Sequence, residues 1–196
     1  MLTSTISITF IKGGFVMFVF TEFETPIGLV QLVFPESTYA PALFNVIQTH
    51  VSEFAKWLPW ATTTDSVEAE VAFINDARMK NAQYELLSLV ILVDGHPSGT
   101  IDLHDLEAEI HHAKIGYWLD PTYQGFGIMT EAVKQLTQRA LTDLGFHKLT
   151  IEIDTLNEKS IAVAEHAGFT YEATLKDQII NEGEYRDVFL YTKLAD

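Results

Sequence analysis

Cysteine is absent from the 196 residues of this chain. Disulfide bonds, thiolate metal sites and any mechanism with a cysteine nucleophile are therefore excluded, so an acyl-cysteine intermediate cannot form. The absence suits a reducing compartment, and we expect a cytoplasmic protein. The 7 histidines show no His-Glu-x-x-His or similar ligand spacing, so we expect no metal site.

Long apolar runs are missing as well. No stretch approaches the roughly 20 apolar residues that a membrane-spanning helix needs, and we expect no membrane partner. Near the start, Lys12 and a glycine pair interrupt the apolar residues, and no small-residue cleavage site follows, so a signal peptide is not expected. We expect residues 1–16 to form a loosely ordered extension and residues 17–196 to form one domain.

Basic residues are few. The chain has 12 Lys and Arg against 27 Asp and Glu, which gives a formal net charge of -15. This charge repels nucleic-acid backbones, and no basic run opposes it, so nucleic-acid binding is not expected. Two interpretations stay open: the acidity attracts a cationic partner, or it only keeps the protein soluble.

The hydrophobic pattern of the first two-thirds predicts helices followed by an antiparallel meander. Helical spacing occurs in residues 43–50 and again in residues 67–74, where Thr64 or Asp65 is the expected N-cap. The Asp94-Gly95 pair predicts a tight turn between strands. The strands expected in this part are residues 28–34, 85–93, 100–106 and 110–119.

The last third predicts a strand-helix-strand crossover. Residues 127–144 keep helical apolar spacing until Gly145, and residues 149–153 then alternate as a strand. A short helix is expected at 160–167, ended by Gly168, with a closing strand at 186–194. The expected fold class is α/β (α+β), with a mixed central sheet and flanking helices.

A strand-to-helix junction carries the clearest chemical signal. The letters GYWLDP at 116–121 end a strand, and Gln124-Gly125-Phe126-Gly127 leads into the long helix. A helix N-terminus with nearby glycines suits a pyrophosphate, although a simple tight turn is an equal alternative for a lone Gly-x-Gly. The residues that a nucleotide P-loop or a Rossmann fingerprint requires are absent.

Two spaced blocks make a family resemblance specific. The first resembles the coenzyme-A motif Gln/Arg-x-x-Gly-x-Gly/Ala of the GNAT acetyltransferase superfamily, with Met129 as a departure at the last position. The second, which runs from Asn157 through Ser160 to Gly168-Phe169, is similar to a pattern of the branch that acetylates ribosomal-protein N-termini. The resemblance implies the GNAT fold, with an antiparallel N-terminal meander and a splayed strand pair at the cofactor site.

The resemblance also implies acetyl-CoA as cosubstrate and assigns roles to residues. Backbone groups of Trp118 and Leu119 would pair with the pantetheine arm, and Ser160 would protonate the leaving thiolate. Helix capping is the alternative for Asn157 and Ser160. The expected cofactor-binding residues are Trp118, Leu119, Gln124, Gly125, Phe126, Gly127, Ile128, Met129, Thr130 and Asn157.

The general base is harder to place. The two positions where related enzymes carry a glutamate hold Lys114 and Ile179 here. Strand alternation puts His112 on the same face as Lys114, which makes His112 the expected base, although a surface histidine without a catalytic role is the favoured alternative. The other candidates are Glu109, His111 and Asp177.

The missing acids favour an N-terminal amine as acceptor, because its pKa of about 8 leaves more neutral amine than the pKa of about 10.4 of a lysine. Trp57 and Tyr123 are candidates for the acceptor groove, whereas Trp60 is expected in the core. We expect direct attack in a ternary complex. The alternatives are a catalytically weak acyl-CoA-binding or sensing protein, and an enzyme acting on a polyamine or an aminoglycoside-like amine. A homodimer is possible on general grounds.

Overall fold

The computed structural model describes residues 7–11, 15–181 and 183–195. The strands in this part form one sheet in the order β1-β2-β3-β4-β5-β6-β7-β9-β8. Their bounds are β1 Ser7–Ile11, β2 Phe15–Thr25, β3 Gly28–Val33, β4 Leu87–Val93, β5 His96–Glu107, β6 His112–Leu119, β7 Lys148–Asp154, β8 Thr170–Asn181 and β9 Glu184–Leu194.

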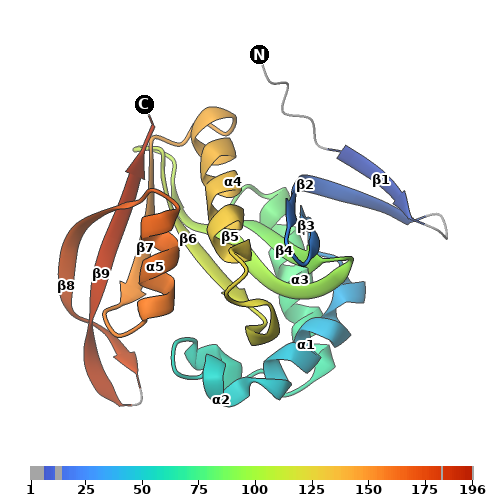
Figure 1. The fold of residues 1–196 in the computed structure, drawn as a ribbon, viewed down its shortest axis with the longest axis horizontal. Coiled ribbons are helices and arrows are strands. Elements are labelled where there is room, and N and C mark those ends of the chain that lie inside the picture. Colours follow the sequence, from blue (N-terminus) through green and yellow to red (C-terminus); the bar gives the residue numbers. More distant parts are fainter. Residues whose placement is uncertain (1–6, 12–14, 182, 196) are drawn as a thin grey trace.

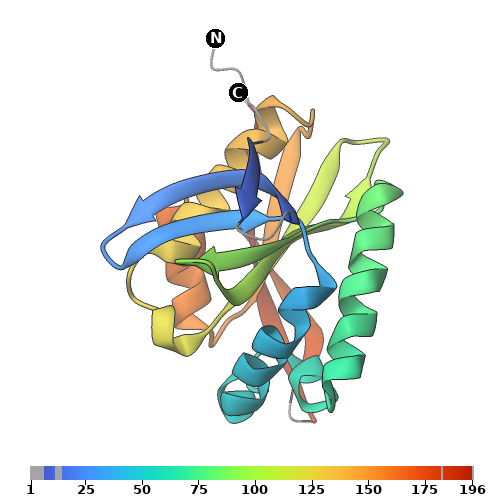
Figure 2. The same cartoon turned by 90° about the vertical axis from the view of Figure 1, so that its right-hand side faces the viewer.

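Helices cover both faces of the sheet. The main helices are α1 Ala40–Thr49, α2 Val51–Phe54, α3 Val67–Ala82, α4 Ile128–Thr142 and α5 Glu158–His166. Figure 2 shows α1 and α3 on one side of the sheet and α4 and α5 on the other. Each face has its own apolar core, one containing Leu43 and Ile74, the other containing Leu136 and Leu149. No helix of the described ranges is long and apolar enough to cross a membrane.

The meander and the crossover confirm the predicted fold class. Strands β3 to β6 pair antiparallel in sequence order, and β6 pairs with β7 in parallel after the passage through α4. Asp94 and Gly95 both have positive φ, as the predicted tight turn requires. In α4 most residues of the apolar spacing are buried, including Val133 and Leu136, whereas Leu144, at the end of the expected helix, is 49% exposed.

Three strands were not predicted. β1 and β2 form an antiparallel hairpin that projects from the body of the molecule (Figure 1). β2 begins at Phe15 and β1 covers residues 7–11, so part of the expected N-terminal extension is strand, while residues 1–6 and 12–14 lie outside the described residues. β8 pairs with β9 at the far edge of the sheet, with register shifts that break regular alternation.

The central strands β6 and β7 separate part of the way along. Their parallel pairing joins His112 to Lys148 and ends with Lys114 opposite Thr150. β6 nevertheless continues to Leu119 and β7 to Asp154. The splayed strand pair expected from the family resemblance is therefore present, and it leaves an open edge on β6 beyond Lys114.

The N-cap of α3 is Ser66, and not Thr64 or Asp65 as the sequence suggested. Ser66 has extended backbone angles, and its hydroxyl accepts a hydrogen bond from the Ala69 N–H at 3.2 Å. This bond satisfies one of the unpaired N–H groups at the helix start.

Replacement of Ser66 tests this cap. We expect Ser66→Ala to lower the free energy of unfolding by about 1 kcal/mol, because the Ala69 N–H loses its acceptor. Urea denaturation measures the change. Asp65→Ala is the matched control and should cost less, and an equal or larger loss in the control would show that Ser66 is not the cap.

Candidate active site

The open edge of β6 presents backbone groups of alternate residues. The Asp120 N–H donates to the Ser98 carbonyl on the β5 side at 2.7 Å, whereas the Leu119 carbonyl, on the other side, accepts from Gln124 Nε2 at 3.3 Å. By the alternation of a strand, the backbone groups of Tyr117 and Leu119 face the gap toward β7. The backbone of Trp118 faces Thr100 of β5 instead, so it does not lie at the open edge where its backbone role was expected.

The start of α4 lies directly after this edge and has the form of an anion site. Gly125 and Gly127 have φ of 84° and 79°, which favours glycine, and a Cβ at either position would meet open space. Gly127 is the N-cap and provides no side-chain cap, so the first N–H groups of the helix stay free for a ligand. The side chain of Met129 is buried, so a ligand at the first turn of α4 would meet the backbone of Met129 and not its side chain.

The start of α5 places a hydroxyl pair beside the same gap. Asn157 caps the helix by accepting from the Ser160 N–H at 3.2 Å, as the capping alternative predicted. The Ser160 Oγ lies 2.8 Å from the Tyr117 hydroxyl. Burial raises the pKa of Tyr117 to about 12, so this phenol stays protonated at neutral pH and can act as a hydrogen-bond donor.

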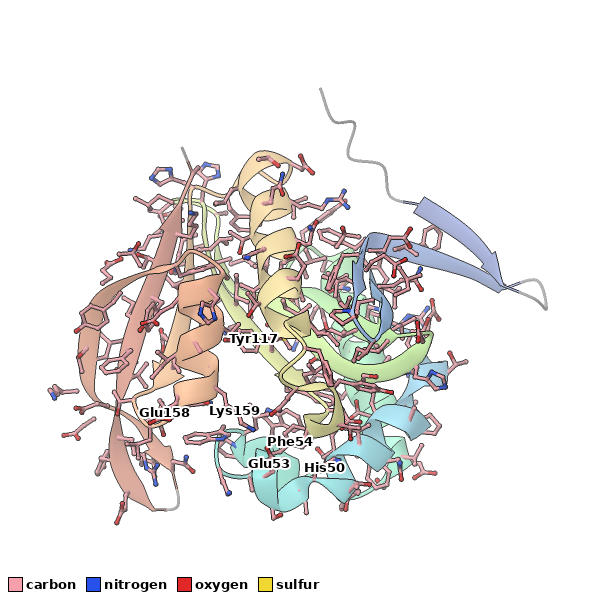
Figure 3. The ribbon with its side chains drawn as sticks, in the orientation of Figure 1. His50, Glu53, Phe54, Tyr117, Glu158 and Lys159 are labelled. Atoms are coloured by element: carbon pink, nitrogen blue, oxygen red, sulfur yellow. The ribbon has the colours of Figure 1, made fainter. Side chains whose placement is uncertain are left out.

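Lys159 connects the elements in front of the gap. Its Nζ donates to Gln124 Oε1 at 2.7 Å and to Glu53 Oε1 at 3.3 Å. Figure 3 shows Lys159 between α5 and α2, below Tyr117. A positive charge beside the glycine loop adds to the attraction of the α4 N-terminus for a phosphate.

A cavity of about 470 Å³ opens on the opposite face of the sheet, under α3. Its wall includes Gly116, Tyr117 and Trp118, so it reaches the part of β6 that has left β7. Trp60, expected in the core, is 39% exposed and lines this cavity, with its ring 6.2 Å from that of Trp118. The polar groups in the wall include Glu70, Asp102 and His104.

Asp102 and His104 form a hydrogen-bonded pair on β5. The Asp102 Oδ1 lies 2.6 Å from the His104 Nδ1. This hydrogen bond raises the pKa of His104 above its ordinary value, against the opposing effect of burial. The pair lies opposite Gly116 and Lys114 in the register of β5 and β6.

Glu70 is a buried carboxyl group without a partner. It is 4% exposed, and no donor among the described residues bonds its side chain. Burial alone raises the pKa of Glu70 to about 7. A perturbed acid that lines a cavity is typical of a functional site.

The structure does not bring His112 into this cavity. Its Nδ1 bonds Glu107 and its Nε2 bonds Thr150, each at 2.9 Å, so both ring nitrogens are engaged. It also lies where β6 and β7 are still paired, which is before the gap begins. Lys114, in place of the usual acid, forms ion pairs with Glu152 and Asp105 at 2.8 and 3.3 Å.

The two aromatic candidates for the acceptor groove also lie elsewhere. Neither Trp57 nor Tyr123 is in the wall of the cavity that borders β6. Tyr123 packs against the core under α4 and α5. Within the described residues, no cluster of three or more His, Asp or Glu side chains could hold a metal ion.

Comparison with known proteins agrees with this geometry. Residues 14–170 match the family model described as an acetyltransferase (GNAT) domain. The chain is 33% identical to the ribosomal-protein-serine acetyltransferase of Escherichia coli, over 79% of this chain and 86% of that protein. It is 31% identical to the spermidine N(1)-acetyltransferase of Escherichia coli, over 55% of this chain and 60% of that protein.

A solved structure shows the same arrangement. The microcin C7 self-immunity acetyltransferase MccE, in complex with acetyl-CoA and AMP, superimposes with a TM-score of 0.81 and 30% sequence identity. The match covers 87% of this chain and 97% of that chain. The chain therefore belongs to the GNAT acetyltransferase family, and it is an N-acetyltransferase that uses acetyl-CoA. This confirms the expected family and favours the enzyme over an acyl-CoA-binding protein.

Some residues of the site were missed in the sequence. Strand alternation predicts that Asp102 and His104 lie on the same face of their strand. The sequence does not show that this face borders a cavity. Glu70 resembles any other acidic residue of an exposed helix. Tyr117 was part of the recognised motif, and only its contact with Ser160 shows what its side chain does.

The raised pKa of Glu70 predicts a pH-dependent stability. An ordinary glutamate ionises near 4.5, so between about pH 4.5 and 7 the unfolded chain loses its proton before the folded protein does. The stability that depends on protonated Glu70 is complete below about pH 4.5 and is lost as the pH rises through about 7. Wild type should therefore lose stability between pH 4.5 and pH 8, whereas Glu70→Gln should not. The difference in unfolding free energy between the two proteins should change by about 2 kcal/mol, in favour of the variant, over this range.

Urea denaturation at the two pH values measures this difference. Glu68→Gln, at an exposed position on the same helix, is the matched control and should follow the wild type. An identical pH dependence in wild type and Glu70→Gln would show that Glu70 titrates normally.

Proposed function

We propose that this enzyme transfers an acetyl group from acetyl-CoA to the N-terminal α-amine of a protein or peptide. The open edge of β6 carries the proposal, because Gly116 and Tyr117 line the cavity on one face and the strand ends at Leu119, shortly before the start of α4. The cosubstrate and the amine would approach from opposite sides and meet at the open edge of β6. Direct attack in a ternary complex then needs no covalent intermediate on the protein.

On the acetyl-CoA side, the proposal assigns binding to backbone groups. Leu119 and Tyr117 would pair with the pantetheine arm as an added strand does. The N–H groups of residues 125–130 would hold the pyrophosphate, supported by the positive end of the α4 dipole and by Lys159. Asn157 is assigned to the pantetheine arm, in addition to its observed role as the cap of α5.

The chemistry requires a neutral amine, a polarised carbonyl group and a proton for the departing sulfur. The amine nitrogen attacks the thioester carbon, a C–N bond forms and the C–S bond breaks. We assign the proton donor for the thiolate to Ser160. Its contact with the Tyr117 hydroxyl supports this role, because the phenol can donate to Ser160 Oγ as that oxygen loses its proton.

Two acceptors fit the site to different degrees. An α-amine is favoured because its lower pKa leaves a useful neutral fraction near neutral pH, and because a relative is named for acetylation of a ribosomal-protein serine. A polyamine is the second candidate. A second cavity next to the first is lined by acidic residues, which favour a ligand with several positive charges. These residues include Asp76, Glu85 and Asp105. A cytoplasmic location and a homodimer remain predictions.

Replacement of Ser160 tests the proton donor. We expect Ser160→Ala to lower kcat by about 100-fold, because the thiolate loses its acid, with little change in the affinity for acetyl-CoA. Ser52→Ala, at an exposed position on α2, is the control. A rate equal to that of wild type would remove this role from Ser160.

The release of free coenzyme A thiol from acetyl-CoA tests the function itself. The assay has no protein background, because the chain contains no cysteine. The panel contains peptides with Ser, Ala or Met at the N-terminus, the same peptides with a blocked N-terminus, and spermidine. Release with the free peptides alone supports the proposal, release with spermidine alone supports the second candidate, and no release with any amine contradicts both.

A further inference from the structure

The cavity on the α3 face contains ionisable groups that the proposed reaction has not yet used. They are Glu70 on α3 and the Asp102–His104 pair on β5. The positions of Lys114 and Ile179 hold no acid, so neither provides the group that removes a proton from the acceptor. The inference below rests on the proposed function and assigns this part of it.

The hydrogen bond to Asp102 fixes the ring of His104. An ionised carboxylate only accepts hydrogen bonds, so His104 Nδ1 carries the proton that joins the pair. In the neutral ring, Nε2 is then a free acceptor, and among the described residues it has no hydrogen-bond partner. The side chain is 40% exposed, so a ligand can reach it.

Gly116 keeps the space between this pair and the edge of β6 open. A Cβ on Gly116 would lie 3.2 Å from both Asp102 carboxylate oxygens and 3.2 Å from His104 Cε1. Any side chain here would therefore press on the pair. Because Gly116 lies in the part of β6 that has left β7, the open space lies where the amine would meet the thioester.

Glu70 adds an unpaired carboxylate to the same wall. A carboxylate that is 4% exposed and lacks a donor is costly unless a ligand supplies one. An ammonium group supplies three N–H donors and a positive charge. The neighbouring Trp60 and Trp118 rings give a cation an aromatic wall as well.

We infer that Glu70 and the Asp102–His104 pair form the acceptor-amine site, in which Glu70 binds the ammonium group and His104 Nε2 removes its proton. Asp102 acts through His104 and is a positioning residue. His112, the base expected from the sequence, has no part in this assignment, because both of its ring nitrogens are bonded.

The protons balance in the following way. The bound ammonium group gives one proton to His104 Nε2, which passes it to solvent, and the neutral amine attacks the thioester carbon. The C–N bond forms and the C–S bond breaks. The nitrogen loses a second proton, which balances the proton that Ser160 supplies to the thiolate sulfur. The products are an amide, free coenzyme A and one proton in solvent.

The surrounding charges make this step favour alkaline pH. His104 can accept a proton only when it is neutral, and the hydrogen bond to Asp102 raises its pKa, so activity should rise as the pH rises through that pKa. The ionisable groups that line the two cavities with His104 or act on it are Glu70, Asp76 and Lys80 on α3, Glu85, Asp102 and Asp105, and Lys114 on β6.

Steady-state thiol release, measured for wild type, His104→Gln and Glu70→Gln against the best amine of the panel, tests the inference. We expect His104→Gln to lose about 100-fold or more in kcat and to lose the wild-type rise with pH. Glu70→Gln should raise KM for the amine by about tenfold or more. Added imidazole should restore part of the activity of His104→Ala, which a purely structural role would not allow.

Matched variants separate these effects from misfolding. His166→Gln on α5 and Glu68→Gln on α3 replace exposed residues of the same types and should keep wild-type kinetics. Equal thermal shifts with acetyl-CoA in all variants would show that each one folds and binds the cosubstrate.

The inference is contradicted, while the proposed function stands, if wild type turns over an amine and either variant keeps wild-type kinetics. If wild type itself releases no thiol with any amine of the panel, the proposed function fails and the acceptor site fails with it. The two failures are therefore distinguishable in one experiment.

Discussion

The separation of β6 from β7 is the constraint on which the rest of the site depends. A parallel pair that stayed in register to Leu119 would satisfy the backbone groups of β6 that point toward β7 and would leave no open edge. Pairing instead ends at Lys114 and Thr150, and the backbone of Tyr117 and Leu119 faces the gap. Groups of this kind are costly when buried and unpaired, so the open edge is suited to a ligand that hydrogen-bonds like a strand.

The two faces of the sheet carry groups of opposite charge near the open edge of β6. On the α4 and α5 face, two helix N-termini, the backbone of Gly125 and Gly127 and the Lys159 side chain create positive potential for phosphate groups. On the α3 face, Glu70 and Asp102 create negative potential for an amine. Under the proposed function, this polarity would attract the anionic cosubstrate and the cationic acceptor to opposite sides.

Much of the fold could be predicted from the sequence because its signals are local. Helical spacing in residues 127–144 and the Asp94-Gly95 turn depend on neighbours in the chain, and both appear as expected. β8 was missed although apolar and polar residues alternate over 171–176, because the alternation does not continue to Asn181 and the register of β8 with β9 shifts twice. The cap of α3 differed by one residue, since Thr64, Asp65 and Ser66 are all good capping types and only backbone geometry selects Ser66.

The site was predictable only where a motif describes it. The glycine loop and the block from Asn157 to Ser160 are contiguous patterns that sit at helix starts, and the structure places both beside the gap. The expected base was chosen by strand alternation, which gives a face but not a position along the strand. His112 and Gly116 share a face of β6, yet only Gly116 borders the cavity. Glu70 comes from a distant part of the chain, so no spacing could reveal it.

Backbone amide exchange on β6, followed by NMR with and without acetyl-CoA, tests the central claim most directly. The amides of Tyr117 and Leu119 face the gap, so acetyl-CoA should slow their exchange by an order of magnitude or more, while Trp118, which faces β5, should change little. If acetyl-CoA binds and the exchange of Tyr117 and Leu119 stays the same, the cosubstrate does not occupy the gap and the account is wrong.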